Sequence, residues 1–262
     1  MGSAAPLDAG ALPALATDPK FIFFTDFDGT ITLQDSNDYM TDNLGYGPEK
    51  RKQGNKDVLF GKRDFRSSFR EMLDSVPTPF DECVRTLLAN VKLDPGFKQF
   101  FEWSRAANVP VVVLSGGMQP IIRALLAHLV GHDCVDHIQI VSNDVAPRPG
   151  SKGINEPNGW HIVFHDDSGF GHDKSIEIRK YSQLPKERRP TLFYAGDGVS
   201  DLSAARETDL MFAKEGRDLV TYCKNEKIPY EEFSDFTSIL ATVKAIVEGK
   251  TTIEEAAKRA QQ

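Results

Sequence analysis

Five short apolar runs constrain the fold of this 262-residue chain more than any other feature. Each run is bounded by polar residues or glycine, and most lack the strict alternation of a strand with one solvent-facing side. Such runs are typical of strands in a parallel sheet that is covered on both faces. The runs occupy residues 21–24, 109–114, 138–141, 192–195 and 210–213.

Amphipathic segments between these runs predict helices. One segment begins near Pro120 and ends at Gly131. Another begins at Asp235, whose side chain can cap a helix, and ends at Gly249. Because strands alternate with helices, the sequence predicts an α/β fold with a doubly wound, mostly parallel sheet.

Residues 36–107 interrupt this alternation because they contain only helical signals. Asp64, Thr78-Pro79 and Asp94-Pro95 each precede a stretch with apolar residues on one helical face. We therefore expect residues 36–107 to form a helical cap domain, inserted over the carboxyl end of the sheet. The catalytic core would then comprise residues 19–35 and 108–262.

Two other segments depart from the strand and helix pattern. Residues 143–173 are rich in glycine and proline around one strand-like piece at residues 160–164, which predicts a hairpin or flap in the core. Residues 1–18 are small and weakly apolar, so we expect a flexible tail there.

The composition limits the partners of the chain. The formal net charge is −7, and an acidic chain is a poor general partner for nucleic acids and anionic membranes. No apolar run is long enough to cross a bilayer. The three cysteines are far apart, which argues against a disulfide framework or a zinc site and fits a reducing compartment. We expect a cytoplasmic monomer or small homo-oligomer.

The strongest chemical signal is DFDGTIT at residues 26–32, directly after the first apolar run. Asp26 and Asp28 at a strand end can both face the crevice where open α/β sheets bind ligands, and Gly29 permits the sharp turn that follows. The alternative is a polar loop whose aspartates only cap a turn. Five specified residues in one short window favour the first interpretation.

Three further segments add weaker signals. Ser115, Gly116 and Gly117 follow the second apolar run, where a hydroxyl and glycine amides can cradle a phosphate. Lys174 lies at a helix start and can counter phosphate charge. In GDGVSD at residues 196–201, Asp197 and Asp201 offer the hard oxygen ligands that suit Mg²⁺. Taken singly, each segment could equally be an ordinary turn or a surface lysine.

In this order along the chain, the four segments resemble the motifs of the haloacid dehalogenase-like (HAD-like) phosphatase superfamily. A helical insertion between the first two motifs resembles the C1-capped branch. That branch includes phosphoserine phosphatases and the methionine-salvage phosphatase of a methylthio-diketopentane phosphate. The run DFDGTITLQDSND is most similar to the latter and to fungal small-metabolite phosphatases of the polyol-phosphate type.

The resemblance implies a Mg²⁺-dependent phosphatase that hydrolyses a small phosphate monoester through an aspartyl phosphate. Asp26 would be the nucleophile and a metal ligand, and Asp28 the acid and base. Asp28 would also bind the metal through its backbone carbonyl, and Thr30 would hold its side chain. Ser115, Gly116, Gly117 and Lys174 would bind the phosphate. Asp197 would bind the metal directly, and Asp201 through water, unless it orients Lys174.

The substrate-binding residues are expected in the cap. Residues 49–70 contain eight basic and three acidic side chains, which form either a solvated helix face or a site for a polar substrate group. Arg63 and Arg66 are the candidates for that contact. Tyr39, Met40 and Phe69 could contact an apolar part, although such residues are more often core. Among the histidines, His172 is expected near the site, and a second metal site at His161 and His165 is not favoured.

Three other functions stay open on this sequence. A phosphotransferase would use the same aspartyl phosphate, and a phosphoserine or phosphoprotein phosphatase would use the same chemistry on another substrate. A binding or regulatory protein without activity would normally lack the nucleophile or the acid, and both are present here. A large cap favours a small substrate, because it closes over the site and excludes water.

Overall fold

A computed structural model describes residues 12–259 of the chain. Its described part contains a seven-stranded sheet in the order β4-β3-β2-β1-β5-β6-β7. Neighbouring strands are parallel, except that β3 and β4 are antiparallel. The strands are β1 (Phe21–Thr25), β2 (Val111–Met118), β3 (Gln139–Pro147), β4 (Trp160–Val163), β5 (Thr191–Gly196), β6 (Leu210–Lys214) and β7 (Tyr230–Phe233). The expected doubly wound, mostly parallel α/β fold is confirmed.

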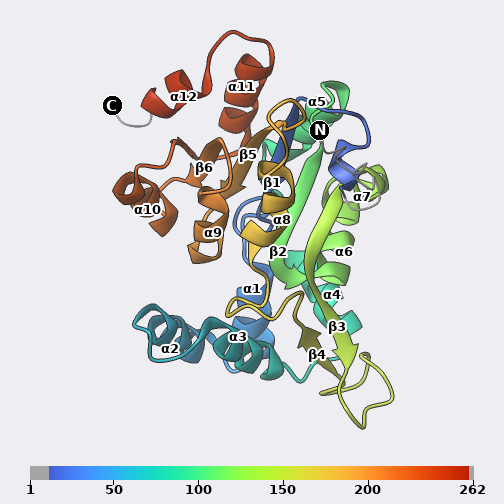
Figure 1. Cartoon of the computed structure of the whole chain (residues 1–262). Helices are drawn as coiled ribbons and strands as arrows, with labels where there is room; N and C mark the ends of the chain where they lie inside the picture. Colours follow the sequence, from blue (N-terminus) through green and yellow to red (C-terminus); the bar gives the residue numbers. More distant parts are fainter. Residues whose placement is uncertain (1–11, 260–262) are drawn as a thin grey trace, which may run out of the picture.

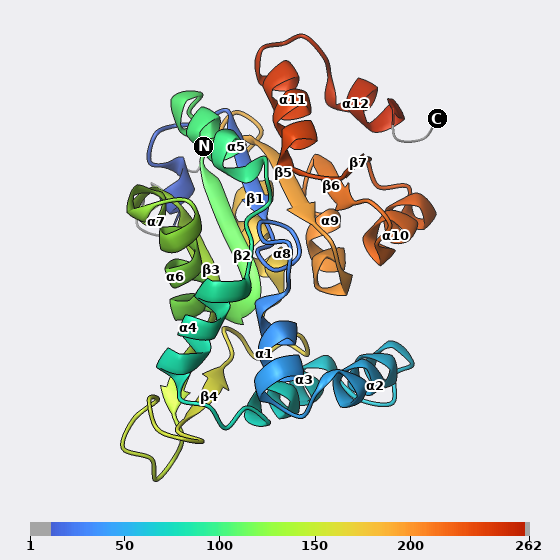
Figure 2. The same ribbon diagram turned by 180° about the vertical axis from the view of Figure 1, so that it is seen from behind.

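Helices cover both faces of this sheet, as the continuous apolar runs predict. Phe23 of β1 faces one layer, which includes α5 (Phe97–Ala106), α6 (Gln119–Leu129) and α11 (Phe236–Val247) (Figure 2). Ile22 and Phe24 face the other layer, which includes α8 (Lys174–Ser182), α9 (Leu202–Ala205) and α10 (Asp218–Glu226) (Figure 1). Successive β1 side chains are therefore buried on opposite faces, which explains why residues 21–24 are all apolar; the polar Thr25 is the last residue of the strand.

The remaining helices are short connections or lie beyond the sheet. They are α1 (Ser36–Leu44), α2 (Pro48–Leu59), α3 (Phe65–Asp74), α4 (Phe80–Asn90), α7 (His132–His137) and α12 (Ile253–Arg259), with 3₁₀ turns at Pro13–Leu15 and Val199–Asp201. Two predicted caps are confirmed. An oxygen of Asp64 accepts a hydrogen bond from Ser67 N at 2.7 Å, and one of Asp235 accepts from Thr237 N at 2.8 Å.

The helices between β1 and β2 divide into two groups. Helices α1, α2 and α3 lie together beyond the carboxyl ends of the strands (Figure 1). Helix α5 instead packs on the sheet, where the ring of Phe97 lies 5.0 Å from the ring of Phe236 in α11. These contacts favour grouping α5 with the core, and the division of the chain into cap and core stays a prediction.

The segment after β3 contains an antiparallel pair, with Val145 of β3 opposite Ile162 of β4. The Trp160 side chain of this hairpin donates a hydrogen bond to Thr78 O at 2.8 Å, so the hairpin is held against the start of α4. At the other end of the chain, residues 1–11 of the expected tail lie outside the described residues. Leu12 and Ala14 are buried against the core.

In residues 12–259, none of the helices combines the length and the apolar character that a membrane span requires.

Candidate active site

The site lies where three neighbouring strands end. Asp26 follows β1, Ser115 lies near the end of β2, and Asp197 follows β5. Strand β1 pairs with both β2 and β5, so residues that follow these strands meet at one edge of the sheet. The backbone N–H of Asp26 donates to Ala195 O at 2.8 Å, which fixes the nucleophile candidate beside the β5 loop.

Lys174 joins the carboxylates of two segments. Its Nζ lies 2.8 Å from Asp26 Oδ1 and 2.7 Å from Asp201 Oδ1, and its side chain is 1% exposed. Helix α8 begins at Lys174, and the Asp173 side chain caps this start by accepting from Ser175 N at 3.0 Å. Burial disfavours the charged amine, but the two carboxylates outweigh this effect and raise the pKa of Lys174.

Asp201 is held by four donors. Its Oδ1 accepts from Lys174 Nζ and from the Tyr194 hydroxyl at 2.5 Å, and its Oδ2 accepts from the N–H groups of Asp197 and Gly198, both at 3.0 Å. A Cβ at Gly196 would collide with the Asp201 carboxylate. Both oxygens of Asp201 are therefore engaged, and this carboxylate orients Lys174 and the 197–198 loop.

The carboxylates form a cluster that suits a divalent cation. One oxygen each of Asp26, Asp197 and Asp201 lies within 4.8 Å of the others. Burial raises the pKa of Asp26 to about 7 although Lys174 opposes it. Burial, with repulsion from Asp26 and Asp201, raises the pKa of Asp197 to about 8. Because one lysine does not neutralise three carboxylates, and because hard oxygens suit Mg²⁺, the residues fit the expected metal.

Asp28 is held by the start of α1 rather than by Thr30. Asp28 Oδ1 accepts from Ser36 N at 2.7 Å, and Oδ2 accepts from Asn37 Nδ2 at 3.0 Å. Burial, and then the charge of Asp35, raise the pKa of Asp28 well above its usual range. The expected role of Thr30 was wrong, because its buried hydroxyl has no hydrogen-bond partner among residues 12–259.

The glycine-rich segment lies against Asp28. The N–H of Gly117 donates to Ser115 Oγ at 3.0 Å. A Cβ at Gly117 would lie 3.0 Å from Asp28 Oδ2 and 3.3 Å from Ser115 Oγ, whereas a Cβ at Gly116 would meet nothing within 4 Å. Gly117 thus permits the close approach of the two segments, and Gly116 leaves open space beside them.

Two supporting residues come from the hairpin and the loop after it. Asn143 Nδ2 donates to Gly116 O at 2.7 Å, and its Oδ1 accepts from His165 N at 2.8 Å. The ring Nδ1 of His172 lies 2.9 Å from Ser115 O. Burial lowers the pKa of His172 to about 4, so this ring is neutral near pH 7 and its Nδ1–H donates to the carbonyl. The sequence signalled His172 by its position near Lys174 but gave no signal for Asn143.

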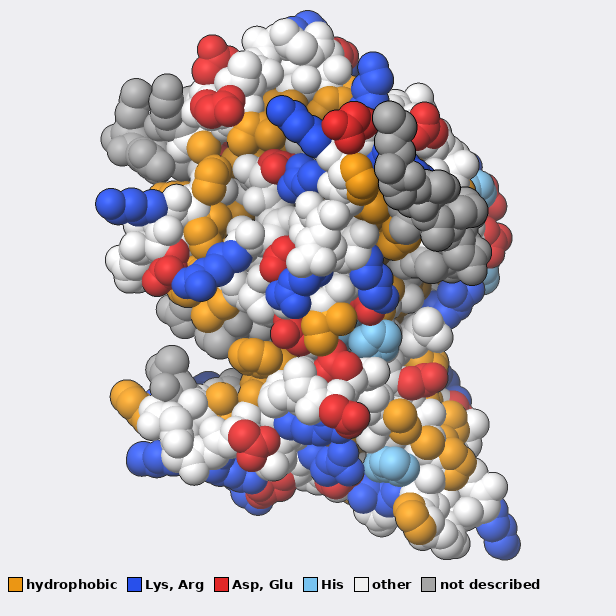
Figure 3. Space-filling view, viewed as in Figure 1, with side chains coloured by type: hydrophobic (Ala, Val, Ile, Leu, Met, Phe, Trp, Pro, Cys, Tyr) orange, Lys and Arg blue, Asp and Glu red, His pale blue; other side chains and the backbone are white. Residues whose placement is uncertain are grey.

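The two arginines that were expected to bind the substrate have other partners. Arg63 pairs with Glu71 at 2.6 Å. Arg66 Nη1 donates to Asp166 O at 2.6 Å and to Ser168 O at 3.1 Å, and its guanidinium lies 4.4 Å from the ring centre of Phe164. The structure therefore does not bring Arg63 and Arg66 to the carboxylate cluster. On the face shown in Figure 3, lysines and arginines are spread over both the upper and the lower part of the surface, with acidic side chains between them.

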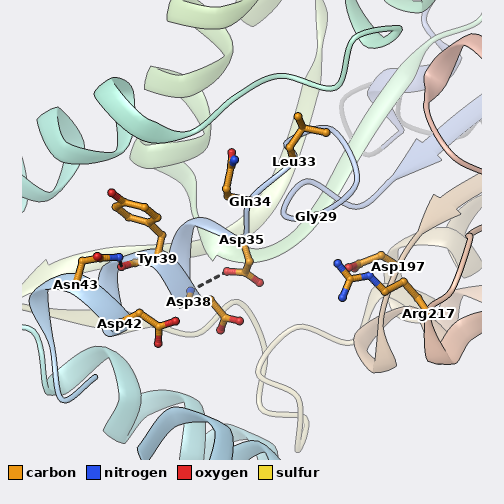
Figure 4. Close-up of a pocket in the computed structure, with 10 residues that line it drawn as sticks. All are labelled: Gly29, Leu33, Gln34, Asp35, Asp38, Tyr39, Asp42, Asn43, Asp197 and Arg217. Atoms are coloured by element: carbon orange, nitrogen blue, oxygen red, sulfur yellow. Dashed lines mark hydrogen bonds between the residues drawn. The ribbon is translucent and has the colours of Figure 1, made fainter. Parts of the chain in front are cut away.

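A pocket of about 320 Å³ opens beside Asp197. Helix α1 forms one wall, and Arg217 and Asp197 lie on the opposite side (Figure 4). Arg51 pairs with two carboxylates of this wall, Asp38 at 2.7 Å and Asp42 at 2.6 Å. The lining residues are Gly29, Leu33, Gln34, Asp35, Asp38, Tyr39, Asp42, Asn43, Asp197 and Arg217.

The sequence pointed to Gly29, Tyr39 and Asp197 of this pocket and missed the other lining residues. Tyr39 lines it, whereas Met40 is fully buried in the core and Phe69 packs against that core. The acidic residues Asp35, Asp38 and Asp42 recur at helical spacing, which could have indicated one acidic face of α1.

Comparisons with known proteins agree with this geometry. The chain is 50% identical over 242 residues to "Polyol phosphate phosphatase PYP1" of Saccharomyces cerevisiae, covering 90% of this chain and 98% of the relative. It is 51% identical over 225 residues to "Pdp3-interacting factor 1" of Schizosaccharomyces pombe, covering 86% and 95%. A substrate-bound phosphoserine phosphatase has the same fold, with a TM-score of 0.63 and 17% identity over 85% of this chain and 98% of that one.

A family model for haloacid dehalogenase-like hydrolases matches residues 23–206, which span most of the chain and include all four motif segments. The resemblance that the motifs indicated is thereby confirmed. The chain belongs to the haloacid dehalogenase-like hydrolase family.

Proposed function

We propose that this protein is a Mg²⁺-dependent phosphatase that hydrolyses a small phosphate monoester through a phosphorylated Asp26. The observation that carries the proposal is the contact of Lys174 with Asp26 and Asp201, at 2.8 and 2.7 Å, beside the Ser115–Gly117 segment. A buried cation, a buried carboxylate and a hydroxyl- and glycine-containing segment beside them are the parts that in-line phosphoryl transfer requires.

In the first step, Asp26 attacks phosphorus and the bond to the leaving alcohol breaks. Asp26 and Asp197 would hold Mg²⁺, with Asp201 positioning the loop and Lys174. When bound, Mg²⁺ neutralises charge so that a phosphate can approach a carboxylate. Ser115, Gly116, Gly117 and Lys174 hold the non-bridging oxygens of the phosphate. An Asp is required at position 26, because one extra methylene would displace the attacking oxygen.

Asp28 acts on the proton in both steps. Protonated Asp28 gives its proton to the departing oxygen, and the carboxylate that remains takes a proton from the water that hydrolyses the aspartyl phosphate. Burial and the neighbouring Asp35 raise its pKa, which favours the protonated form that the first step needs. The hydrogen bonds from Ser36 N and Asn37 Nδ2 support the carboxylate that the second step needs.

We infer that the substrate is a polyol phosphate or a similar hydroxylated metabolite. A relative that is 50% identical carries the name polyol phosphate phosphatase. The pocket beside Asp197 is lined by carboxylate and amide groups from α1 and the segment before it, which can accept hydrogen bonds from hydroxyls. The acidic wall disfavours a second anionic group on the substrate. Helices α1, α2 and α3 would act as the cap that closes over the phosphate.

The test is hydrolysis of a panel of phosphates with and without Mg²⁺, with Asp26→Asn as the blank. We expect Mg²⁺-dependent release of phosphate, fastest with polyol phosphates and slower with phosphoserine. Release of phosphate at the same rate by Asp26→Asn would end the proposal. An added alcohol acceptor tests the phosphotransferase alternative, since a transferase would yield a new phosphate ester instead of inorganic phosphate.

A further inference from the structure

The side chain of Asn37 connects the cap helix α1 to Asp28. Its Nδ2 donates to Asp28 Oδ2 at 3.0 Å, and the preceding N–H, that of Ser36, donates to Asp28 Oδ1 at 2.7 Å. Both oxygens of Asp28 are thus held by consecutive residues at the beginning of α1. Asn37 is 4% exposed and Asp28 is 6% exposed, so neither hydrogen bond competes with bulk water.

The backbone of Asn37 is itself fixed. Asp35 caps α1, and its Oδ1 accepts from Asn37 N at 2.8 Å and from Asp38 N at 2.9 Å. Asn37 therefore lies in the first turn of the helix, where its amide turns back toward the sheet. The amide also borders the phosphate cradle, because a Cβ at Gly117 would lie 3.6 Å from Asn37 Nδ2 and 3.0 Å from Asp28 Oδ2.

Stability alone does not explain an asparagine at this position. Within residues 12–259, the buried Oδ1 of Asn37 finds no hydrogen-bond partner. A buried acceptor without a partner destabilises the fold, and an apolar side chain of similar shape would avoid that cost. What asparagine provides here, and an apolar side chain would not, is the Nδ2 donor, which binds Asp28.

We propose that Asn37 is a positioning residue that holds Asp28 so that its proton reaches the departing oxygen. This inference rests on the proposed phosphatase function. As the bond between phosphorus and the departing oxygen breaks, the electron pair stays on that oxygen and the proton of Asp28 moves to it. The new bond forms between phosphorus and Asp26. The start of the cap helix therefore takes part in the acid step.

The loss of kcat/KM in an Asn37 variant should depend on how basic the leaving group is, and this dependence provides the test. An alkoxide is strongly basic and needs the proton as it departs, whereas a nitrophenolate is weakly basic and leaves without it. The value of kcat/KM reports the steps up to departure of the alcohol. Asn37→Leu keeps the number and branching of the side-chain heavy atoms and removes the donor, so its kcat/KM is measured on glycerol phosphate and on p-nitrophenyl phosphate.

We expect Asn37→Leu to lose about 10²-fold in kcat/KM on glycerol phosphate, the lower end of what general acid catalysis contributes. We expect little loss on p-nitrophenyl phosphate. With that substrate, a burst of nitrophenol should precede slower turnover, because the hydrolysis of the aspartyl phosphate also needs Asp28. Asn90→Leu is the control in another helix, since Asn90 is exposed and its Nδ2 donates to the helix carbonyl of Thr86 at 2.8 Å.

Each outcome separates the inference from the function on which it rests. Equal losses on both substrates, or no loss on either, would overturn the positioning role while leaving the phosphatase in place. A wild-type protein that hydrolyses neither substrate would overturn the function itself. If Asn37→Leu does not fold, Asn37→Ser serves instead, because its side chain is smaller and its hydroxyl is too short to span the distance to Asp28 Oδ2.

Discussion

The amine of Lys174 lies 2.8 Å from the carboxylate of Asp26, although 147 intervening residues separate the two along the chain. Both side chains are buried. A carboxylate oxygen of Asp201, in the 3₁₀ turn after β5, lies 2.7 Å from the same amine. Removal of this cation would leave the buried carboxylates of Asp26 and Asp201 without the amine that both contact, with Asp201 still held by its three other donors.

Lys174→Met should therefore weaken both the fold and the reaction. Breaking a buried ion pair from one side typically costs about 3–5 kcal/mol, because the remaining charge stays buried and unpaired. Loss of a preorganised charge at the phosphate should also lower kcat by about 10²–10³-fold. Urea unfolding and phosphate release measure the two effects. Lys180→Met is the control on the same helix, since Lys180 is half-exposed and pairs with Glu177 at the surface; a similar loss there would contradict the interpretation.

Asp197→Asn should separate metal binding from stability. The pKa of Asp197 is raised to about 8 by burial and by its carboxylate neighbours, so removal of its charge should leave the metal-free protein at least as stable. Mg²⁺ at about 100 times its Kd should stabilise the wild type by about 2.7 kcal/mol, and the variant by much less. Thermal unfolding with EDTA and with Mg²⁺ measures both quantities. An unchanged Mg²⁺ response in Asp197→Asn would exclude this residue as a ligand.

His172 should make the protein less stable in mild acid. Its pKa is lowered to about 4 in the fold by burial, against about 6.5 in an unfolded chain. Between these values the unfolded state binds more protons, so the contribution of His172 is complete above pH 6.5 and is lost as the pH falls toward 4. The stability difference between wild type and His172→Gln should shrink by about 2 kcal/mol from pH 7.5 to pH 5. Parallel urea-unfolding profiles against pH would contradict this.

Arg66→Gln should loosen the loop before α8. The arginine holds two carbonyls of that loop, Asp166 O at 2.6 Å and Ser168 O at 3.1 Å, and its loss should cost about 1.5–3 kcal/mol. Amide exchange over residues 164–172 should become faster. Arg63→Gln is the control, because Arg63 pairs at the surface with Glu71. A large rise in KM with unchanged exchange would instead return Arg66 to the role of a substrate ligand.

Much of the sheet could be predicted from the sequence because its strands are buried on both faces. The runs at residues 21–24, 192–195 and 210–213 all lie in strands. Strand β7 was missed, since its sequence Tyr-Glu-Glu-Phe places two charged residues between buried aromatic ones at the edge of the sheet. Strand β3 continues through Ser142, Asn143 and Asp144, whose polar side chains conceal its length.

The chemical motifs were predictable for a different reason. Parallel strands that pair as neighbours place their carboxyl ends together, so residues after β1 and β5 had to meet. The partners of Arg66 were not predictable, because they are backbone carbonyls about 100 positions away that carry no residue-specific signal. The contact of Asn37 with Asp28 depends on how the chain turns at Asp35, which the sequence did not specify.

The link between Arg66 and the loop at residues 166–168 has a mechanical consequence. That loop continues through His172 to Lys174. The contacts of Arg66 therefore connect helix α3 to the segment that carries the buried lysine. Helix α1 makes a second connection to the site, through the hydrogen bond from Asn37 to Asp28. If helices α1, α2 and α3 form the proposed cap, these two contacts restrain it at both ends. Opening of that cap would then break the Arg66 contacts or displace the loop that leads into Lys174, which would link substrate entry to the placement of the lysine charge.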